Sequence, residues 1–326
     1  MTRNKVKWGV LGTANVASWG TIPGMLKSES CELYAVAGRK LEKAEKYKTD
    51  FGFEKAYGSY DELLDDKEVQ AIYIPLPNNL HKEWVIKVLK AGKNVLCEKP
   101  MGLNADEIRE MFKVAEESGS LLMEAYAYLH SPYVLSLVKD VKSGVIGDVD
   151  YIETAFITQG YKEDIRLHKE LGGGAMYDLG CYCTTMILSL IDSDVTLVKA
   201  DAEFSDGGVD INTAGLLKFS NGARASFNCG FIFGENTNSR FDRLLIHGTK
   251  GRILSDVEYN QEGNVSYKII VGDEVIERNV DIPHNYSLEI EQFSRCILYG
   301  EKPHVTADFS IRNAELIDRL LEDMGY

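Results

Sequence analysis

Two features that direct a chain to or across a membrane are missing from this sequence. No apolar run approaches the roughly 20 residues that a transmembrane helix needs, although 44% of the 326 residues are hydrophobic. The amino terminus leads directly into a predicted strand at Lys5–Leu11, and it contains no long apolar core or cleavage site. We therefore expect no secretory signal, and a protein of the cytoplasm.

Cysteine is scarce and irregularly spaced. None of the spacings is typical of a zinc site, and Cys181 and Cys183 form only a Cys-x-Cys pair within a predicted helix. In a chain without an export signal, we expect reduced thiols and no metal site. The six cysteines are Cys31, Cys97, Cys181, Cys183, Cys229 and Cys296.

Basic residues are outnumbered by acidic ones. Lys and Arg total 36 against 50 Asp and Glu, which gives a formal net charge of -14. Nucleic acids and anionic membranes both favour a basic protein surface, so we expect neither as a partner. A phosphate-bearing cofactor remains possible, because it needs only a locally positive pocket.

The length of the chain favours two domains, since 326 residues exceed the usual size of one. Residues 1–125 alternate between strand-like apolar runs and helical segments. This alternation predicts an α/β domain with a doubly wound parallel sheet, the Rossmann architecture that binds dinucleotides. The clearest strand signals are Lys5–Leu11, Glu32–Ala37, Val69–Ile74, Lys93–Cys97 and Ser120–Ala125.

The first predicted strand is followed by a turn of the form Gly-x-Ala-x-x-Ala, which is typical of dinucleotide-binding sites. Gly12 permits the tight turn, and the small Ala17 permits close packing of the next helix. Ala14 replaces the usual second glycine but adds only one methyl group. The N–H groups that begin the helix would bind the phosphates, although a tight turn without a ligand is the alternative. The predicted contacts here are Gly12, Thr13, Ala14, Asn15 and Val16.

The second predicted strand is followed by two cations, Arg39 and Lys40. An NAD-specific domain usually carries an acid at this place to bind the ribose 2′-hydroxyl. Cations favour a 2′-phosphate instead, because arginine can bind phosphate bidentately and stack on adenine. We therefore expect NADP(H) rather than NAD, with a solvated helix start as the alternative.

The third predicted strand ends in a proline-shaped loop. Ligands of open α/β sheets bind at the carboxyl ends of the strands, so Pro75, Leu76 and Asn78 are predicted cofactor contacts. His81 follows at the start of a helix. It is a further candidate contact, or else a surface or capping residue.

The fourth predicted strand is followed by Glu98, Lys99 and Pro100. At this edge Lys99 would be well placed to touch a reacting hydroxyl, beside the carboxylate of Glu98. We count both residues among the candidate cofactor contacts. The alternative is an ordinary solvated lysine at a strand end.

The strand–helix alternation stops after Ala125, and residues 126–326 predict a second, α+β domain with a mostly antiparallel sheet. Asn221-Gly222 lies between two alternating runs and is a strong hairpin signal. Helices are expected at about 132–143, 285–299 and 308–324. The predicted strands are Val149–Phe156, Val195–Phe204, Ile211–Phe219, Ala223–Gly230, Arg243–His247 and Val265–Val271.

Three glycines at 172–174 precede a predicted helix in this second domain. Glycines there let the backbone approach something closely, or let the helix enter at an angle. Asp178 and Tyr182 follow with i,i+4 spacing, which puts both on one helix face. A tyrosine beside a lysine can act as an acid or base, because the cation lowers the pKa of the phenol. The alternative is a core tyrosine and a satisfied buried carboxylate.

In combination, the turn after the first strand, Glu98-Lys99-Pro100 and the pattern Gly-Gly-Gly-x-x-x-Asp-x-Gly-x-Tyr resemble the glucose–fructose oxidoreductase / inositol dehydrogenase (Gfo/Idh/MocA) family. Gly248–Gly251 and Asn285–Glu289 extend the resemblance over nearly the whole chain. Within the family the sequence is most similar to NADP-dependent aldose (xylose or glucose) dehydrogenases and dimeric dihydrodiol dehydrogenases. In that branch a tyrosine, matched by Tyr182, replaces the histidine of inositol dehydrogenases.

The resemblance implies hydride transfer between NADP(H) and a cyclic sugar, polyol or trans-diol. It also implies that Lys99 and Tyr182 are the catalytic pair, that Asp178 supports the site, and that the second domain binds substrate and forms a homodimer or homotetramer through its sheet. Two departures leave the substrate open: Leu129 stands where many relatives carry arginine, and no histidine directly precedes Pro132. Weaker candidates for substrate contacts, each equally compatible with a structural role, are Arg166, His168, Phe231, Arg240 and Asn285.

Two other functions are compatible with the same scaffold. One is an NAD-dependent glycosidase that keeps its cofactor bound, and the Arg39-Lys40 pair argues against it by favouring exchangeable NADP. The other is a non-catalytic protein that senses NADP. Lys99 and Tyr182 argue against a sensor, because a sensor needs neither.

Overall fold

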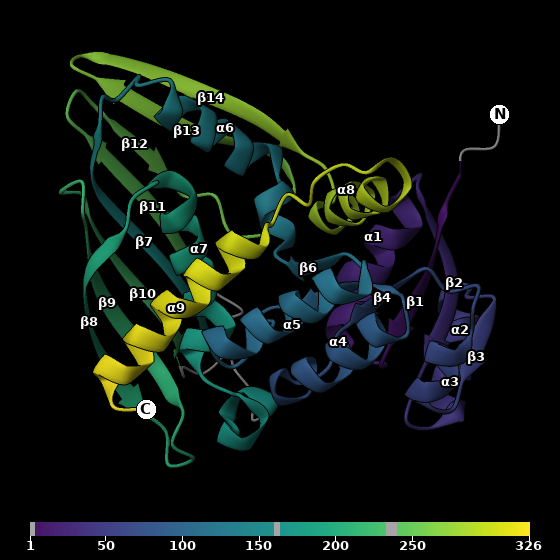
Figure 1. Cartoon of the computed structure of the whole chain (residues 1–326). Helices are drawn as coiled ribbons and strands as arrows, with labels where there is room; N and C mark the ends of the chain where they lie inside the picture. The colour runs from purple at the N-terminus through teal and green to yellow at the C-terminus, as the bar shows by residue number, and fades with distance from the viewer. Residues whose placement is uncertain (1–3, 160–163, 233–239) are drawn as a thin grey trace. The chain divides into compact units, whose positions relative to one another are not determined.

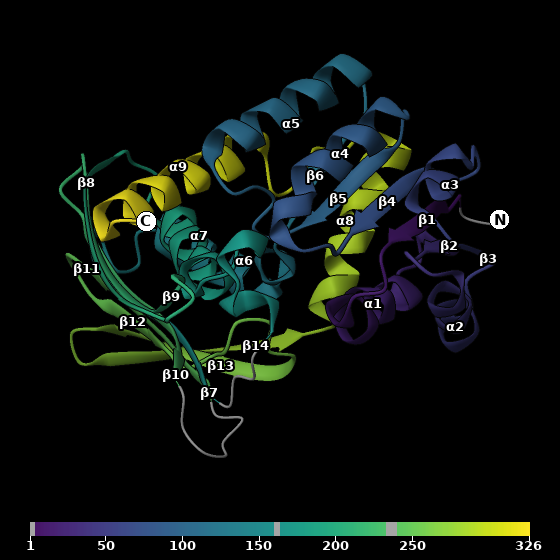
Figure 2. The same cartoon turned by 90° about the horizontal axis from the view of Figure 1, so that it is seen from below.

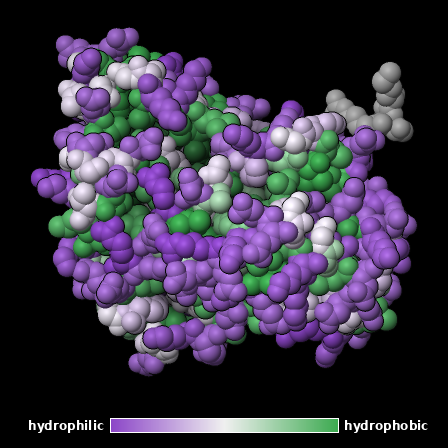
Figure 3. All heavy atoms as spheres, viewed as in Figure 1, coloured by the Kyte–Doolittle hydropathy of each residue, from purple (hydrophilic) through white to green (hydrophobic). Residues whose placement is uncertain are grey.

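The computed structural model describes residues 4–159, 164–232 and 240–326. Two compact units make up the chain: unit 1 is Met1–His130 with Pro283–Ile311, and unit 2 is Ser131–Ile282 with Arg312–Tyr326. On the face seen in Figure 3, hydrophilic residues predominate over hydrophobic ones. None of the helices in the described part of the chain combines the length and the apolar character that crossing a bilayer demands.

Unit 1 is built on a six-stranded sheet of order β3-β2-β1-β4-β5-β6, in which every neighbouring pair is parallel. This order is that of a Rossmann fold, so the predicted doubly wound sheet is confirmed. Burial of both sheet faces explains the nearly continuous apolar runs of its strands. The strands are β1 (Val6–Leu11), β2 (Cys31–Ala37), β3 (Lys55–Tyr57), β4 (Ala71–Ile74), β5 (Asn94–Glu98) and β6 (Leu122–Ala125).

Helices cover both sides of this sheet (Figure 2). Side chains cap two of them in the way that their sequences favour: Ser59 accepts from the N–H of Glu62, and Asn104 accepts from the N–H of Glu107. The helices of unit 1 are α1 (Ile22–Lys27), α2 (Leu41–Phe51), α3 (Tyr60–Asp65), α4 (His81–Lys90), α5 (Ala105–Ser118) and α8 (Asn285–Tyr299).

Helix α8 comes from the far end of the chain, yet it belongs to the core of unit 1. The indole N–H of Trp8 in β1 donates to Ser294 at 3.0 Å, and the Trp8 ring contacts the ring of Phe293. Gly24 in α1 lets α8 approach so closely that an added Cβ would lie 2.7 Å from the backbone of Tyr286. The compact units therefore differ from the expected division after residue 125, in which everything later formed the second domain.

Unit 2 contains an eight-stranded sheet of order β14-β13-β12-β11-β7-β10-β9-β8. The β7–β10 pair is parallel and the other pairs are antiparallel, as the predicted mostly antiparallel sheet requires. The Asn221-Gly222 turn joins β9 to β10, with Gly222 at φ +94°. The strands are β7 (Val149–Gln159), β8 (Val195–Phe204), β9 (Asp210–Phe219), β10 (Arg224–Ile232), β11 (Arg240–Gly248), β12 (Arg252–Ser255), β13 (Gly263–Val271) and β14 (Glu274–Ile282).

One face of this sheet carries helices, among them α6 (Pro132–Lys142) and α7 (Cys181–Leu190), as Figures 1 and 2 show. Helix α9 (Ala307–Met324) begins in unit 1 and continues into unit 2 at Arg312. Alternation along the strands buries one set of side chains, such as Leu217 and Phe227, against the helices. Several large apolar side chains of the opposite set are exposed: Leu197, Leu216, Phe241, Leu254 and Val275.

Candidate active site

The turn after β1 has the geometry that its glycine predicts. Gly12 adopts φ +126°, and a Cβ added there would lie 3.1 Å from the side chain of Leu76. The following helix contains a π-helical segment, Ala17–Thr21, before α1 begins. Such segments occur frequently at functional sites. Thr13, Ala14 and Val16 are partly exposed and Asn15 is exposed, so the turn is open to a ligand.

The two cations after β2 are exposed to solvent and could bind a phosphate group. Arg39 and Lys40 are exposed, and neither side chain has an ion pair with another described residue. Lys40 occupies the position before the first residue of α2. A turn that requires glycine, a helix start and two such cations together fit a dinucleotide that carries an extra phosphate.

His81 is completely buried rather than at the surface. Its two ring nitrogens lie 2.9 Å from the carbonyl oxygen of Pro100 and 2.8 Å from that of Leu76. Burial lowers the pKa of His81 to about 4. This histidine therefore connects the loop after β4, with Pro75, Leu76 and the partly exposed Asn78, to the segment after β5.

The ends of β5 and β6 carry a partly exposed lysine and two buried acids. Lys99 precedes a cis peptide bond to Pro100. The neighbouring Glu98 is buried and accepts a hydrogen bond from the phenol of Tyr73. Glu124 at the end of β6 is also buried and accepts from the backbone N–H of Met101 at 2.9 Å. Burial raises the pKa of Glu124 to about 7.

In unit 2 the glycine run lets the backbone approach other parts of the same unit. Gly174 adopts φ +128°, and an added Cβ would lie 2.3 Å from a carboxylate oxygen of Asp210. Asp210 in turn accepts from the backbone N–H of Met176 at 2.7 Å. This contact fixes the start of the π-helical segment Met176–Gly180, which precedes α7.

Two predicted site residues are brought together by this segment. Asp178 lies within it, and Arg166 donates to the Asp178 carboxylate at 2.8 Å. Arg166 also pairs with Asp164 at 2.7 Å. Asp178 is only partly exposed, so the ion pair stabilises a carboxylate that water solvates incompletely.

Tyr182, one turn later in α7, belongs to an aromatic cluster and is partly exposed. Its ring centroid lies 5.2 Å from that of Phe156 and 5.4 Å from that of Tyr259. Its phenol oxygen accepts a hydrogen bond of 3.4 Å from the side-chain amide of Asn260. The phenol is therefore held at a surface by an amide rather than buried in the core.

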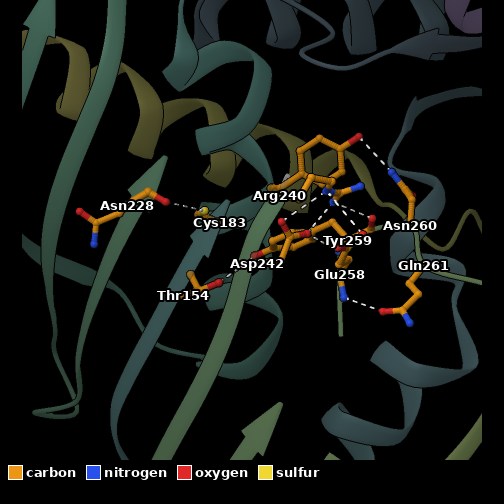
Figure 4. A network of polar contacts seen from close by, with 10 residues as sticks. Thr154, Cys183, Asn228, Arg240, Asp242, Glu258, Tyr259, Asn260 and Gln261 are labelled. Carbon is orange, nitrogen blue, oxygen red and sulfur yellow. Dashed lines mark hydrogen bonds and ion pairs between the residues drawn. The ribbon is translucent and has the colours of Figure 1, made fainter. Parts of the chain in front are cut away.

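A polar network surrounds Tyr259 (Figure 4). The carboxylate of Asp242 accepts from the backbone N–H of Tyr259 at 2.7 Å and pairs with Arg240. Arg240 donates to the carbonyl of Tyr259 at 2.9 Å, and its guanidinium lies 4.6 Å from the ring centroid of Phe156. Burial raises the pKa of Asp242 to about 6, although Arg240 acts in the opposite direction. Arg240, a predicted substrate contact, is thus engaged in bracing this network.

The other candidates for substrate contacts differ in burial and do not all belong to the same unit. His168 is 44% exposed and lies 3.4 Å from Glu170, whereas Phe231 is buried in the core of unit 2. Asn285 is buried at the start of α8, in unit 1. Conversely, the sequence analysis missed Asn260, Asp242 and Tyr259, because no motif marks them.

Comparisons with known proteins agree with this architecture. Residues 6–126 match a family model described as an oxidoreductase family with an NAD-binding Rossmann fold, and residues 134–254 match the GFO/IDH/MocA C-terminal domain.

Similar curated proteins include D-xylose 1-dehydrogenase (NADP(+)) 2 of Haloferax volcanii, with 31% identity over 97% of this chain and 96% of that protein. Another is trans-1,2-dihydrobenzene-1,2-diol dehydrogenase of Xenopus tropicalis, with 31% identity over 98% of each chain. A similar solved structure is the 3-ketoreductase KijD10 from Actinomadura kijaniata in complex with NADP and TDP-benzene, with a TM-score of 0.90, 28% identity and 98% coverage of both chains. The chain therefore belongs to the GFO/IDH/MocA family of oxidoreductases.

Proposed function

We propose that this protein transfers a hydride between NADP(H) and a C–OH or C=O group of a cyclic sugar, polyol or trans-diol, with Lys99 and Tyr182 as the acid–base pair. The observation that carries the proposal is the position of Lys99, which directly follows β5 at the carboxyl edge of a Rossmann sheet. Relatives named as an NADP-dependent xylose dehydrogenase and a dihydrodiol dehydrogenase support the substrate class.

The cofactor is NADP. It supplies the carbon that accepts or donates the hydride. The backbone of the turn after Gly12 would bind its phosphates, and Arg39 and Lys40 would bind the 2′-phosphate. The remaining proposed contacts line the ends of β4 and β5: Pro75, Leu76, Asn78, His81, Glu98 and Lys99.

In the oxidation direction the phenolate of Tyr182 would accept the proton of the substrate hydroxyl, and the bound NADP+ would supply the acceptor for the hydride that leaves the hydroxyl-bearing carbon. The ammonium of Lys99 stabilises the negative charge that develops on the substrate oxygen and favours the phenolate. Asp178 supports the site by accepting a hydrogen bond from Arg166, which holds Arg166 beside the helix that carries Tyr182. Reduction uses the same groups in reverse order.

The exposed apolar residues on the open face of the unit 2 sheet support a further part of the proposal. A surface of this kind, including Leu216 and Phe241, is characteristic of a protein–protein contact. We assign it to the contact between copies of this chain in a homodimer or homotetramer.

The test of the proposed function is a substrate panel assayed with both coenzymes. It comprises aldoses, inositols, 1,2-diols and keto-sugars, and turnover is followed by the absorbance of the reduced nicotinamide. We expect NADP-linked turnover on at least one member. Stoichiometric NAD in the purified protein with glycoside cleavage would instead support the glycosidase, and tight NADP binding without any turnover would support the sensor.

The coenzyme preference gives a first quantitative prediction. We expect the double variant Arg39→Ala/Lys40→Ala to raise KM for NADP+ by about 10–100-fold, because it removes charge-assisted hydrogen bonds to the 2′-phosphate. KM for NAD+, which lacks that phosphate, should change little.

Lys43→Ala is the matched control, since it removes an exposed cation one turn further along α2. Equal increases of both KM values in the double variant would contradict the assignment of these cations to the 2′-phosphate.

A further inference from the structure

Asn260 has an unusual backbone conformation. It lies between β12 and β13 and adopts φ +61°, the only positive φ of a non-glycine residue within the described part of the chain. Asparagine tolerates this left-handed region better than most residues, but the conformation still costs free energy. Strain of this kind persists only where the surrounding structure enforces it, and it is concentrated at functional sites.

Burial of the side-chain amide of Asn260 is a second feature that is unfavourable in free energy. Its amide oxygen is buried, and none of the described residues provides a hydrogen-bond partner for it. Its amide nitrogen donates to the phenol oxygen of Tyr182. A buried acceptor without a partner loses its hydration without compensation. Among the described residues, the one polar contact of this amide is therefore to the proposed catalytic phenol.

The loop is held on both sides of Asn260. On one side the backbone of Tyr259 is fixed by Asp242 and Arg240, and the phenol of Tyr259 bonds to Thr154 at 2.8 Å. On the other side Gln261 accepts from the N–H of Glu258 at 2.9 Å. These contacts, drawn in Figure 4, hold the loop in one conformation, in which the amide of Asn260 points toward the phenol of Tyr182.

We propose that Asn260 is a positioning residue for Tyr182: its amide N–H orients the phenol oxygen and stabilises the phenolate form. The inference rests on the proposed function, in which Tyr182 exchanges a proton with the substrate. A donor aimed at a phenol oxygen favours the ionised form.

The other charged and titratable groups of unit 2 around this phenol are already engaged with one another. Arg240 on β11 forms ion pairs with Asp242 on the same strand and with Glu258 in the loop between β12 and β13. Asp178, on the helical segment before Tyr182, is paired with Arg166. Tyr259 contributes a neighbouring phenol that bonds to Thr154. The amide of Asn260 carries no charge and donates to the phenol oxygen of Tyr182.

The test compares three substitutions of one residue. Asn260→Gly removes the amide but accommodates the positive φ without strain, so a purely conformational role would leave the enzyme unchanged. We expect instead a kcat/KM for the sugar or diol substrate that is about 10–100-fold lower. The ascending limb of the pH profile for oxidation, along which the phenol of Tyr182 loses its proton, should move upward by about one unit. Asn260→Ala should add the backbone strain to this loss.

Asn260→Asp keeps the size and the backbone preference while replacing the donor by a carboxylate. The carboxylate accepts from the phenol and repels the phenolate, so we expect a larger upward shift of the pH profile than with glycine. This variant also keeps the test decisive if the glycine variant is unstable. Asn264→Gly, an exposed position at the start of β13, is the matched control and should behave as wild type.

The outcomes separate this inference from the proposed function. The inference is overturned if Asn260→Gly and Asn260→Asp keep the wild-type rate and pH profile, or lose rate with an unchanged profile, while Tyr182→Phe is inactive. In that case the proposed function still stands. If Tyr182→Phe itself retains wild-type turnover, the proposed function is the part that fails.

Discussion

Tyr182→Phe is expected to lower kcat by about 10²–10⁴-fold, the usual contribution of a positioned acid–base group. Phenylalanine keeps the ring that contacts Phe156 and Tyr259, so the loss isolates the hydroxyl. Binding of NADP+, measured by titration of the protein fluorescence, should remain close to wild type. Tyr299→Phe, which removes an exposed hydroxyl at the end of α8, is the control.

Lys99→Ala should lower kcat over the same range if the lysine acts on the same oxygen. Groups that act as a unit are strongly non-additive, so the double variant should be about as slow as the slower single variant. Lys99 lies in unit 1 and Tyr182 in unit 2, so altered packing within one unit would not explain a non-additive result. Losses that multiply in the double variant would mean that the two residues act independently, and wild-type turnover in either single variant would exclude that residue.

The second large effect is on the free energy of unfolding rather than on the rate. In the folded protein burial raises the pKa of Glu124 from 4.5 to about 7. The folded state therefore binds more protons than the unfolded state between these values, and stability falls as pH rises through them. A difference of about 2.5 units corresponds to about 3 kcal/mol. We expect the free energy of unfolding to fall by about this amount between roughly pH 4.5 and pH 7 on account of Glu124.

Glu124→Gln removes the titration while preserving the shape of the side chain. Urea unfolding at several pH values should show a flatter decline for the variant than for wild type. Glu289, which is buried and has a raised pKa as well, contributes to both proteins and cancels in the comparison. The exposed Glu116→Gln on α5 should keep the wild-type slope, and parallel curves for Glu124→Gln and wild type would refute the assignment.

Most of the fold could be predicted from local patterns. Buried parallel strands are continuous apolar runs, and alternation marks the half-buried strands of unit 2. Three strands were missed for physical reasons: Lys55–Tyr57 and Arg252–Ser255 are very short, and Glu274–Ile282 has charged residues through most of its length. The assignment of α8 could not be predicted, because its partners on α1 and β1 lie more than 250 residues away in the chain.

The candidate site could be predicted only where one short segment contains the signal. Gly12, Arg39 and Lys99 each follow a predicted strand, and that position alone indicates a ligand edge. The contact between Tyr182 and Asn260 spans 78 residues and joins a helix to a loop, so no local pattern reports it. His81 was ambiguous for a similar reason, since one of the carbonyl groups that it contacts belongs to Pro100.

The discontinuity of unit 1 has a consequence for biosynthesis. Trp8 leaves the ribosome 286 residues before Ser294, to which its indole donates, and it also precedes Phe293, whose ring it contacts. During translation, the surface of the unit 1 sheet that α8 covers therefore remains exposed to water until residues 131–282 of unit 2 and then α8 have been synthesised. A fragment of residues 1–130 would lack Pro283–Ile311, which complete unit 1, so we expect it not to fold as an independent nucleotide-binding module.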